Sequence, residues 1–263
     1  MPDAYSILPD RFEDGRHAAL LKGLAANGFH VKQHNPRDWH AGDVLISWTR
    51  HRGPKDDLCH AFEKRGGRVI VAEEPHLKGR FPPTGERLYA LSLSDHQARW
   101  RAGGPERWQG FGVALKPWRE GPGVVLVREQ RGIGSALMAS PADWHNATAV
   151  ALKKITSRPV AIRPHPKNVS RGGGKPVPLS DMRPAVASLV TWSSHDGAEA
   201  LIEGIPVIWR APHGFVRDAC GTRLEQVDDP PRPERMPVFE RMAWAHWRTS
   251  EIENGEAFAW LLG

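Results

Sequence analysis

Apolar strand-like runs alternate with helical patterns through most of this 263-residue chain, and the alternation limits the possible folds more than any other feature. The stretch VTWSSHDGAEALIEGIP, residues 190–206, shows one such step. An apolar run stops at two serines, a short helical pattern follows and ends at Gly204, and the next apolar run begins. This alternation favours an α/β fold with parallel strands.

The same pattern predicts the individual elements. Glycines that follow an apolar helical stripe mark helix ends, because glycine readily adopts the left-handed conformation of a C-cap. The expected helices are 15–27, 55–65 and one opened by Ser140-Pro141-Ala142-Asp143 with the apolar stripe Trp144, Ala147, Ala151 and Ile155. The expected strands are 4–8, 30–34, 43–48, 68–72, 124–127, 159–162, 189–192 and 206–209, with weaker candidates at 88–93 and 111–115.

A Pro/Gly-rich stretch divides the pattern. Residues 116–123, KPWREGPG, read as a linker, after which the strand and helix pattern restarts. Residues 171–178 read as a mobile loop and 228–237 as a Pro-rich connection before a helical tail. Two α/β units joined by the linker are therefore predicted, and one large doubly wound sheet is the alternative.

Composition limits the function classes. A net charge of +6 fits an anionic partner such as nucleic acid, phosphate or a nucleotide, and fits equally a basic solvated surface. No apolar run reaches the roughly 20 residues of a membrane helix, and the first residues lack a secretory pattern. We therefore expect a cytoplasmic protein in which Cys59 and Cys220 are reduced thiols.

The serines of the opening stretch form the first candidate site. In open α/β sheets, ligands bind beyond the carboxyl ends of strands, where helices begin. Ser193 or Ser194 can cap the helix that starts near His195, and the helix start suits a phosphate. Glu199 is placed to accept hydrogen bonds from ribose hydroxyls. The alternative is a plain helix cap with a solvated glutamate.

Two further motifs follow expected strands. Arg163-Pro164-His165-Pro166 holds an imidazole between two prolines, where its N–H groups can donate to phosphate and Arg163 adds charge; the alternative is a rigid surface turn. Glu73-Glu74 follows an apolar strand, and a desolvated carboxylate there can act as a general base. One capping acid and one surface acid would explain the pair equally.

Together, the acid pair, His-Pro and Ser-Ser motifs resemble those of bacterial sialyltransferases and polysialyltransferases, and of capsule Kdo transferases. Those are GT-B enzymes, with two Rossmann-like domains and the active site in the cleft between them. The resemblance covers short motifs over about half of the chain, and Pro75 stands where the family has glycine after the acids. The resemblance implies residues 1–118 as the acceptor-side domain, 119–240 as the nucleotide-sugar domain, and 241–263 as a helical tail packing on the first domain.

The resemblance also implies residue roles. Glu74 is the expected general base that deprotonates the acceptor hydroxyl, with Glu73 beside it. No Asp-x-Asp motif occurs, and His30 and His34 lack a third ligand, so neither a metal nor another cofactor is expected. The expected donor-binding residues are Gln130, Arg163, His165, Pro166, Ser193, Ser194, His195 and Glu199.

The sequence thus predicts a metal-independent, inverting glycosyltransferase that uses a nucleotide-sugar. Its basic charge, its Arg/Trp-rich first unit and a tail resembling the closing helices of bacteriophage GT-B-like proteins suggest a hydroxylated base in phage DNA as acceptor. The alternatives are a saccharide acceptor, and a non-catalytic nucleic-acid-binding protein on the same scaffold, because Pro75 replaces glycine. The expected acceptor-binding residues are Arg50, His51, Trp100, Arg101 and Trp108.

Overall fold

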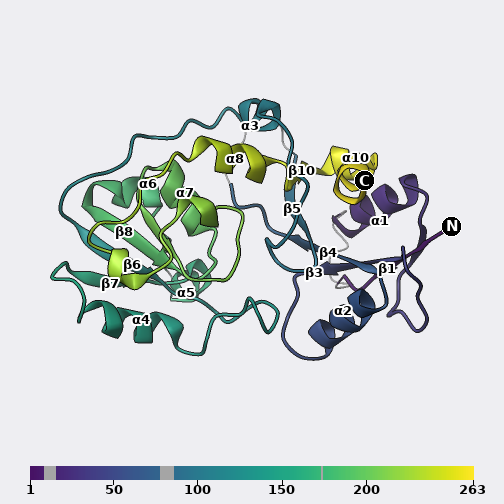
Figure 1. Cartoon of the computed structure of the whole chain (residues 1–263), viewed down its shortest axis with the longest axis horizontal. Helices are drawn as coiled ribbons and strands as arrows, with labels where there is room; N and C mark the ends of the chain where they lie inside the picture. Colours follow the sequence, from purple (N-terminus) through teal and green to yellow (C-terminus); the bar gives the residue numbers. More distant parts are fainter. Residues whose placement is uncertain (9–15, 78–85, 173) are drawn as a thin grey trace. The chain divides into compact units, whose positions relative to one another are not determined.

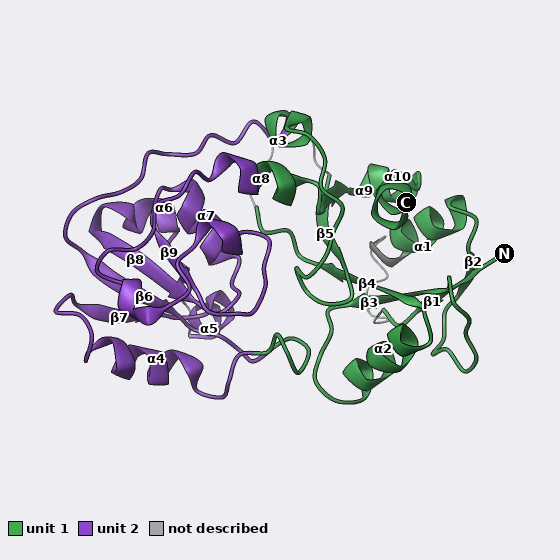
Figure 2. Cartoon of the chain, in the orientation of Figure 1, with its two compact units in different colours: residues 1–110, 133–139, 240–263 green, residues 111–132, 140–239 purple. Residues whose placement is uncertain are grey.

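A computed structural model describes residues 1–8, 16–77, 86–172 and 174–263 (Figure 1). The described residues form two compact units (Figure 2). Unit 1 comprises residues 1–110, 133–139 and 240–263, and unit 2 comprises 111–132 and 140–239. The expected boundary at residue 118 therefore falls inside unit 2, and residues 133–139 belong to unit 1 rather than to the second expected domain. The start of the first expected helix, at Gly15, lies outside the described residues.

The described part of unit 1 is built on a six-stranded sheet of order β10-β5-β4-β3-β1-β2. Strands β1 to β4 are parallel, whereas β5 is antiparallel to both β4 and β10. The α/β class is thus as expected, but the expectation of parallel strands fails at β5. The strands are β1 Asp3–Ser6, β2 His30–Lys32, β3 Val44–Trp48, β4 Arg68–Glu73, β5 Leu88–Leu93 and β10 His246–Arg248.

Helices cover both faces of this sheet (Figure 1). Alternate strand residues face opposite sides: Ile70 and Ala72 pack in the core with the helices α1, α9 and α10, whereas Val69 and Val71 pack with α2. The helices of unit 1 are α1 Arg16–Ala26, α2 Pro54–Lys64, α9 Thr249–Glu253 and α10 Glu256–Leu262; α3, Glu106–Phe111, begins in unit 1.

The last residues of the chain contain a strand as well as helices. The chain passes from unit 2 to unit 1 within α8, Met236–Ala243, and then forms β10, so the tail is not wholly helical as expected. The helix α9 packs closely on α1 at Gly23, where an added Cβ would lie 1.9 Å from the carbonyl oxygen of Ile252. Only glycine permits that approach.

Unit 2 has, in its described part, a four-stranded parallel sheet of order β7-β6-β8-β9. On one face, Val125, Val127 and Val190 pack against α4. On the other, Gly197 of α7 lies against Trp209, and an added Cβ would be 2.8 Å from the indole. The elements are β6 Val124–Arg128, β7 Val160–Arg163, β8 Val186–Thr191, β9 Val207–Trp209, α4 Trp144–Leu152, α5 Pro166–Arg171, α6 Leu179–Met182, α7 Asp196–Ile202, and 3-10 turns Arg183–Ala185, Arg217–Ala219 and Leu224–Gln226.

Two local expectations are wrong. Helix α4 begins at Trp144 after Asp143, which adopts a left-handed conformation (φ 53°) instead of continuing a helix from Ser140. The buried face also differs from the expected stripe, since Thr148 and Leu152 are buried and Ala147 is exposed. The weak strand at 111–115 is absent, because the chain there leaves α3 as an irregular connection.

The Pro/Gly stretch 116–123 is attached to unit 2 at the end of α7. The backbone N–H of Lys116 donates to the carbonyl of Ile202 (2.8 Å), and that of Arg119 to Gly204 (2.6 Å). The last carbonyl groups of a helix have no hydrogen-bond donor inside the helix. The N–H groups of the stretch therefore supply donors to carbonyl groups at the end of α7. Gly204 has a φ of 74° and ends the helix as predicted.

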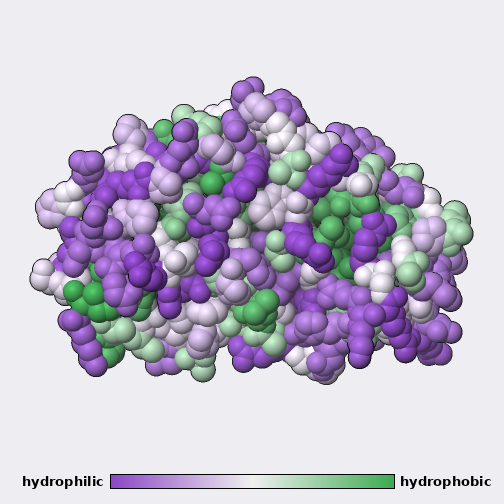
Figure 3. Space-filling view, in the orientation of Figure 1, coloured by the Kyte–Doolittle hydropathy of each residue, from purple (hydrophilic) through white to green (hydrophobic). Residues whose placement is uncertain are grey.

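No helix in the described ranges is long and apolar enough to cross a membrane. The face drawn in Figure 3 is mostly hydrophilic, with a few separate hydrophobic areas. The most exposed large apolar side chains apart from Met1 are Leu137 at 61% and Val150 at 57%. Both cysteines are free thiols, Cys59 buried in unit 1 and Cys220 half-buried in unit 2.

Candidate functional site

The two central strands of unit 2, β6 and β8, are followed by helices on opposite faces of the sheet. Helix α4 follows β6 and α7 follows β8. Open α/β sheets bind ligands at such a point, beyond the carboxyl ends of the strands. Gln130 follows β6 here and its amide Nε2 lies 3.4 Å from Thr191 Oγ1 at the end of β8. Ser193 and Ser194 come directly after.

The N-cap residue of α7 is His195, and Ser194, just before it, makes the side-chain contact with the helix start. The backbone N–H of Ser194 donates to Thr191 Oγ1 (3.1 Å), and its Oγ accepts the N–H of Asp196, the first residue of α7 (3.2 Å). Ser193, His195 and Glu199 are all half-buried, the first two just before α7 and the third on it. Four of the expected donor-side residues, Ser193, Ser194, His195 and Glu199, therefore gather at the start of one helix.

Asp196 is a central residue of this edge that sequence reasoning missed. Its Oδ2 lies 2.7 Å from Arg128 Nε and 2.8 Å from Arg163 Nε, so one carboxylate joins the ends of β6 and β7 to α7. Burial lowers the pKa of Arg128, and the charge of Asp196 opposes that shift. Arg163, which was expected to add charge at a phosphate, is one of two guanidiniums that share this single acid.

His165 is the N-cap residue of α5. Its Nδ1 accepts the N–H of Lys167 (3.2 Å), and its own backbone N–H donates to Glu129 Oε2 (2.6 Å). Burial, with Arg131 and Arg128 nearby, lowers the pKa of His165 to about 4. The imidazole is therefore neutral near pH 7 with its proton on Nε2. The neutral imidazole offers one N–H donor rather than two. Pro166 is the first residue of α5.

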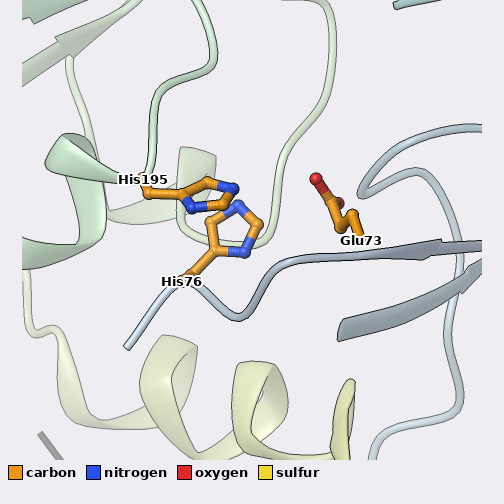
Figure 4. Close-up of side chains that lie close together, drawn as sticks. All are labelled: Glu73, His76 and His195. Atoms are coloured by element: carbon orange, nitrogen blue, oxygen red, sulfur yellow. The ribbon is translucent and has the colours of Figure 1, made fainter. Parts of the chain in front are cut away.

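In unit 1, the expected acids follow the central strand β4. Glu73 is the last residue of β4 and is 7% exposed, whereas Glu74 is half-buried. His76 is 1% exposed, and one of its ring nitrogens lies within 4.8 Å of a Glu73 carboxylate oxygen. Figure 4 shows the side chains of Glu73, which ends β4, and of His76, and also the imidazole of His195, which precedes α7.

Thr49 is a strained residue at the same edge of unit 1. It has a φ of 58°, which is unusual for a β-branched side chain, and its N–H donates to the carbonyl of Ala72 just before Glu73 (3.0 Å). Its Oγ1 lies 2.7 Å from His51 Nε2. Backbone strain of this kind is common at functional sites. The contacts of Thr49 with His51 and Ala72 hold His51 beside the end of β4.

Arg50 does not face an acceptor surface as expected. The side chain is 2% exposed, and its guanidinium pairs with Asp56 Oδ1 (2.5 Å) and Glu63 Oε2 (3.1 Å) of α2. A buried guanidinium needs such partners, and they tie the end of β3 to α2. Trp108, at 3% exposure, is likewise a core residue.

Trp100 and Arg101 pack on the end of the chain. The Trp100 indole N–H donates to the carbonyl of Arg241 (2.7 Å), and the Arg101 guanidinium lies 4.4 Å from the ring centroid of Trp260. Trp260 in turn stacks on Trp244 at 4.2 Å. The Arg/Trp-rich segment therefore fastens the tail to unit 1, a use of aromatic and cationic side chains that composition cannot distinguish from base stacking.

No protein-family model matches the chain, and no curated protein matches it in sequence. Solved structures do match. The KpsC β-Kdo 2,7 transferase of Thermosulfurimonas dismutans aligns with a TM-score of 0.51 at 12% identity, over 98% of this chain and 100% of that one. The KpsC β-Kdo 2,4 transferase of the same organism aligns at 0.50 and 13% identity, over 92% and 90%. At these identities the likeness is one of fold.

Proposed function

We propose that the protein is an inverting glycosyltransferase that moves a sugar from a nucleotide-sugar to a hydroxyl group of a saccharide. The observation that carries the proposal is the polar cluster beyond β6 and β8 of unit 2, at the point where such sheets bind nucleotides. The whole-length fold likeness to two Kdo transferases supports it, and makes Kdo the first sugar to test.

The donor would bind at the carboxyl edge of the unit 2 sheet. The leaving nucleotide gains negative charge in the transition state, and preorganised donors stabilise such charge. Ser193, the Nε2–H of His165 and the guanidinium of Arg163 supply donors of this kind. Asp196 holds Arg163 in place, and Glu199 on α7 would accept hydrogen bonds from the ribose.

Glu74 in unit 1 would take the proton of the acceptor hydroxyl as that hydroxyl attacks the sugar carbon. Of the two acids it is the more exposed, since Glu73 is buried at the end of β4. We assign Glu73 a supporting role beside His76. Of the side chains that suggested DNA as acceptor, Arg50 and Trp108 are buried, and Trp100 and Arg101 contact the end of the chain. A saccharide acceptor is therefore proposed instead.

Metal independence is part of the proposal, and chelation tests it. Glu73 and His76 together offer a carboxylate and an imidazole, two ligand types that divalent cations accept. If Arg163, His165 and Ser193 stabilise the leaving group, then dialysis against EDTA leaves the transfer rate unchanged. Loss of transfer in EDTA, restored by Mg²⁺, Mn²⁺ or Zn²⁺, would contradict this part of the proposal.

Thermal unfolding with CMP-, UDP- and GDP-sugars, including CMP-Kdo, tests the donor. At a hundred times its dissociation constant a ligand adds about 2.7 kcal/mol, which raises the midpoint by about 5–10 °C. One nucleotide family should stabilise the protein, and Ser193→Ala should reduce that shift. No stabilisation by any nucleotide-sugar, together with salt-sensitive binding of duplex DNA, would favour a nucleic-acid-binding protein instead.

A further inference from the structure

The buried side chain of His246, in the C-terminal tail, contacts residues 74–77, the loop that carries the proposed general base Glu74. His246 begins β10, lies opposite Ala90 of β5, and is 0% exposed. Ala90 is also the partner of Glu73 across the β4–β5 pair. The register of three neighbouring strands therefore aligns a tail histidine with the residue that ends β4.

The hydrogen bonds of His246 fix its protonation state. Its Nε2 lies 3.1 Å from the backbone N of His76, and its Nδ1 lies 2.9 Å from the carbonyl oxygen of Met242. A backbone N–H can only donate and a carbonyl can only accept. The ring therefore accepts at Nε2, donates at Nδ1, and is neutral.

The acceptor at Nε2 satisfies a backbone group of the loop that follows Glu73. His76 is 1% exposed, and a buried N–H without an acceptor costs about 1–3 kcal/mol. Pro75, just before it, has no N–H of its own. The two imidazoles also meet edge to face, with centroids 5.7 Å apart and planes at 85°. One side chain thus holds both the backbone and the ring of His76.

We infer that His246 is a positioning residue that holds the loop Glu74–Leu77, and with it the general base, through the amide of His76. The tail would then help to position the general base, in addition to packing on the sheet of unit 1. The consequence for turnover rests on the proposed function of Glu74. The hydrogen bond to His76 does not, and it is tested separately.

Two substitutions separate the two hydrogen bonds of His246. In His246→Gln the longer side chain reaches the Nε2 position and keeps an acceptor for the His76 N–H. In His246→Asn the shorter side chain reaches only the Nδ1 position, so it keeps the donor to Met242 and loses that acceptor. Both remove the ring, so a purely structural role predicts similar losses of stability and no difference in turnover by the folded enzyme.

We expect the His76 amide to exchange with deuterium faster in His246→Asn than in His246→Gln or the wild type. With CMP-Kdo and a Kdo-terminated oligosaccharide, kcat should fall about 10- to 100-fold in His246→Asn, the range expected for a misplaced catalytic group. The KM for the donor should not change, and His246→Gln should keep most of the kcat. Denaturation in urea gives the folded fraction used to correct each rate.

Equal His76 exchange in the two variants would overturn the inference, whatever the activity. Equal kcat in the two variants, in an enzyme whose wild type transfers sugar, would overturn it as well. A wild type that transfers no sugar from any donor would instead overturn the proposed function, and exchange at His76 would still decide whether His246 holds the loop.

Discussion

Glu74→Gln is expected to lower the rate of sugar transfer by about a thousand-fold, within the range that general-base catalysis supplies. Glutamine keeps the size of the side chain and removes the group that accepts the acceptor's proton. The proposed donor residues belong to unit 2, so nucleotide-sugar binding should survive. Single-turnover transfer measures the first effect, and isothermal titration with the donor measures the second.

Two variants control this experiment. Glu256→Gln changes an exposed acid of α10 in the same unit and should transfer sugar at the wild-type rate. Glu73→Gln alters the buried acid beside His76, and should retain more activity than Glu74→Gln if Glu74 is the base. Donor binding that disappears in Glu74→Gln would place Glu74 in the donor site, against the proposed role.

Gly204→Ala is expected to destabilise unit 2 by about 3 kcal/mol or more, the range of severe backbone strain combined with overpacking. Gly204 has a φ of 74°, and an added Cβ would lie 2.0 Å from the carbonyl oxygen of Pro117. A backbone oxygen cannot move aside as a flexible side chain can. Stretch 116–123 must therefore separate from the end of α7, which urea denaturation monitored by tryptophan fluorescence will detect.

Gly112→Ala is the matched control. Gly112 lies in the same unit with a φ of 65°, but an added Cβ meets nothing within 4 Å. Its cost should be the left-handed backbone penalty alone, about 1–2 kcal/mol. Equal losses in the two variants would mean that the contact between Gly204 and Pro117 contributes nothing.

The elements that the sequence predicts well are those whose apolar runs are buried on both faces. Residues 43–48 and 68–72 contain few polar side chains, and each became a strand close to its expected bounds. Of the two weaker candidates, 88–93 became a strand and 111–115 did not. Gly204 likewise ended its helix as expected, because the left-handed conformation at a helix end favours glycine wherever it occurs.

The elements that the sequence predicts wrongly depend on tertiary contacts, which leave no local pattern in the sequence. β10 is three residues long and exists because it pairs with β5, so nothing in His246–Arg248 marks it as a strand. Helix α4 begins later than expected because Asp143 interrupts the chain in a left-handed conformation, and its buried face is set by packing on the sheet. The antiparallel pairing of β5 with β4 likewise has no local mark in residues 88–93.

For the candidate site, the sequence identified residue types at strand ends but not their partners. Arg163 ends β7 and His165 follows it, close to where they were expected, yet Asp196 and Glu129, which hold them, were missed. Their acids stand 33 and 36 positions away along the chain, so only strand adjacency reveals the pairs. Arg50 was misassigned for the same reason, since an arginine that binds α2 and one that binds a ligand look alike in sequence.

Mass-spectrometric detection of a transferred sugar tests the central claim most directly. The purified protein is incubated with CMP-Kdo, or with whichever nucleotide-sugar stabilises it most, and a panel of saccharide acceptors. The account predicts a product heavier than the acceptor by one sugar residue and of opposite anomeric configuration to the donor, absent with Glu74→Gln. Retained configuration, or no product with any donor that binds, would contradict it.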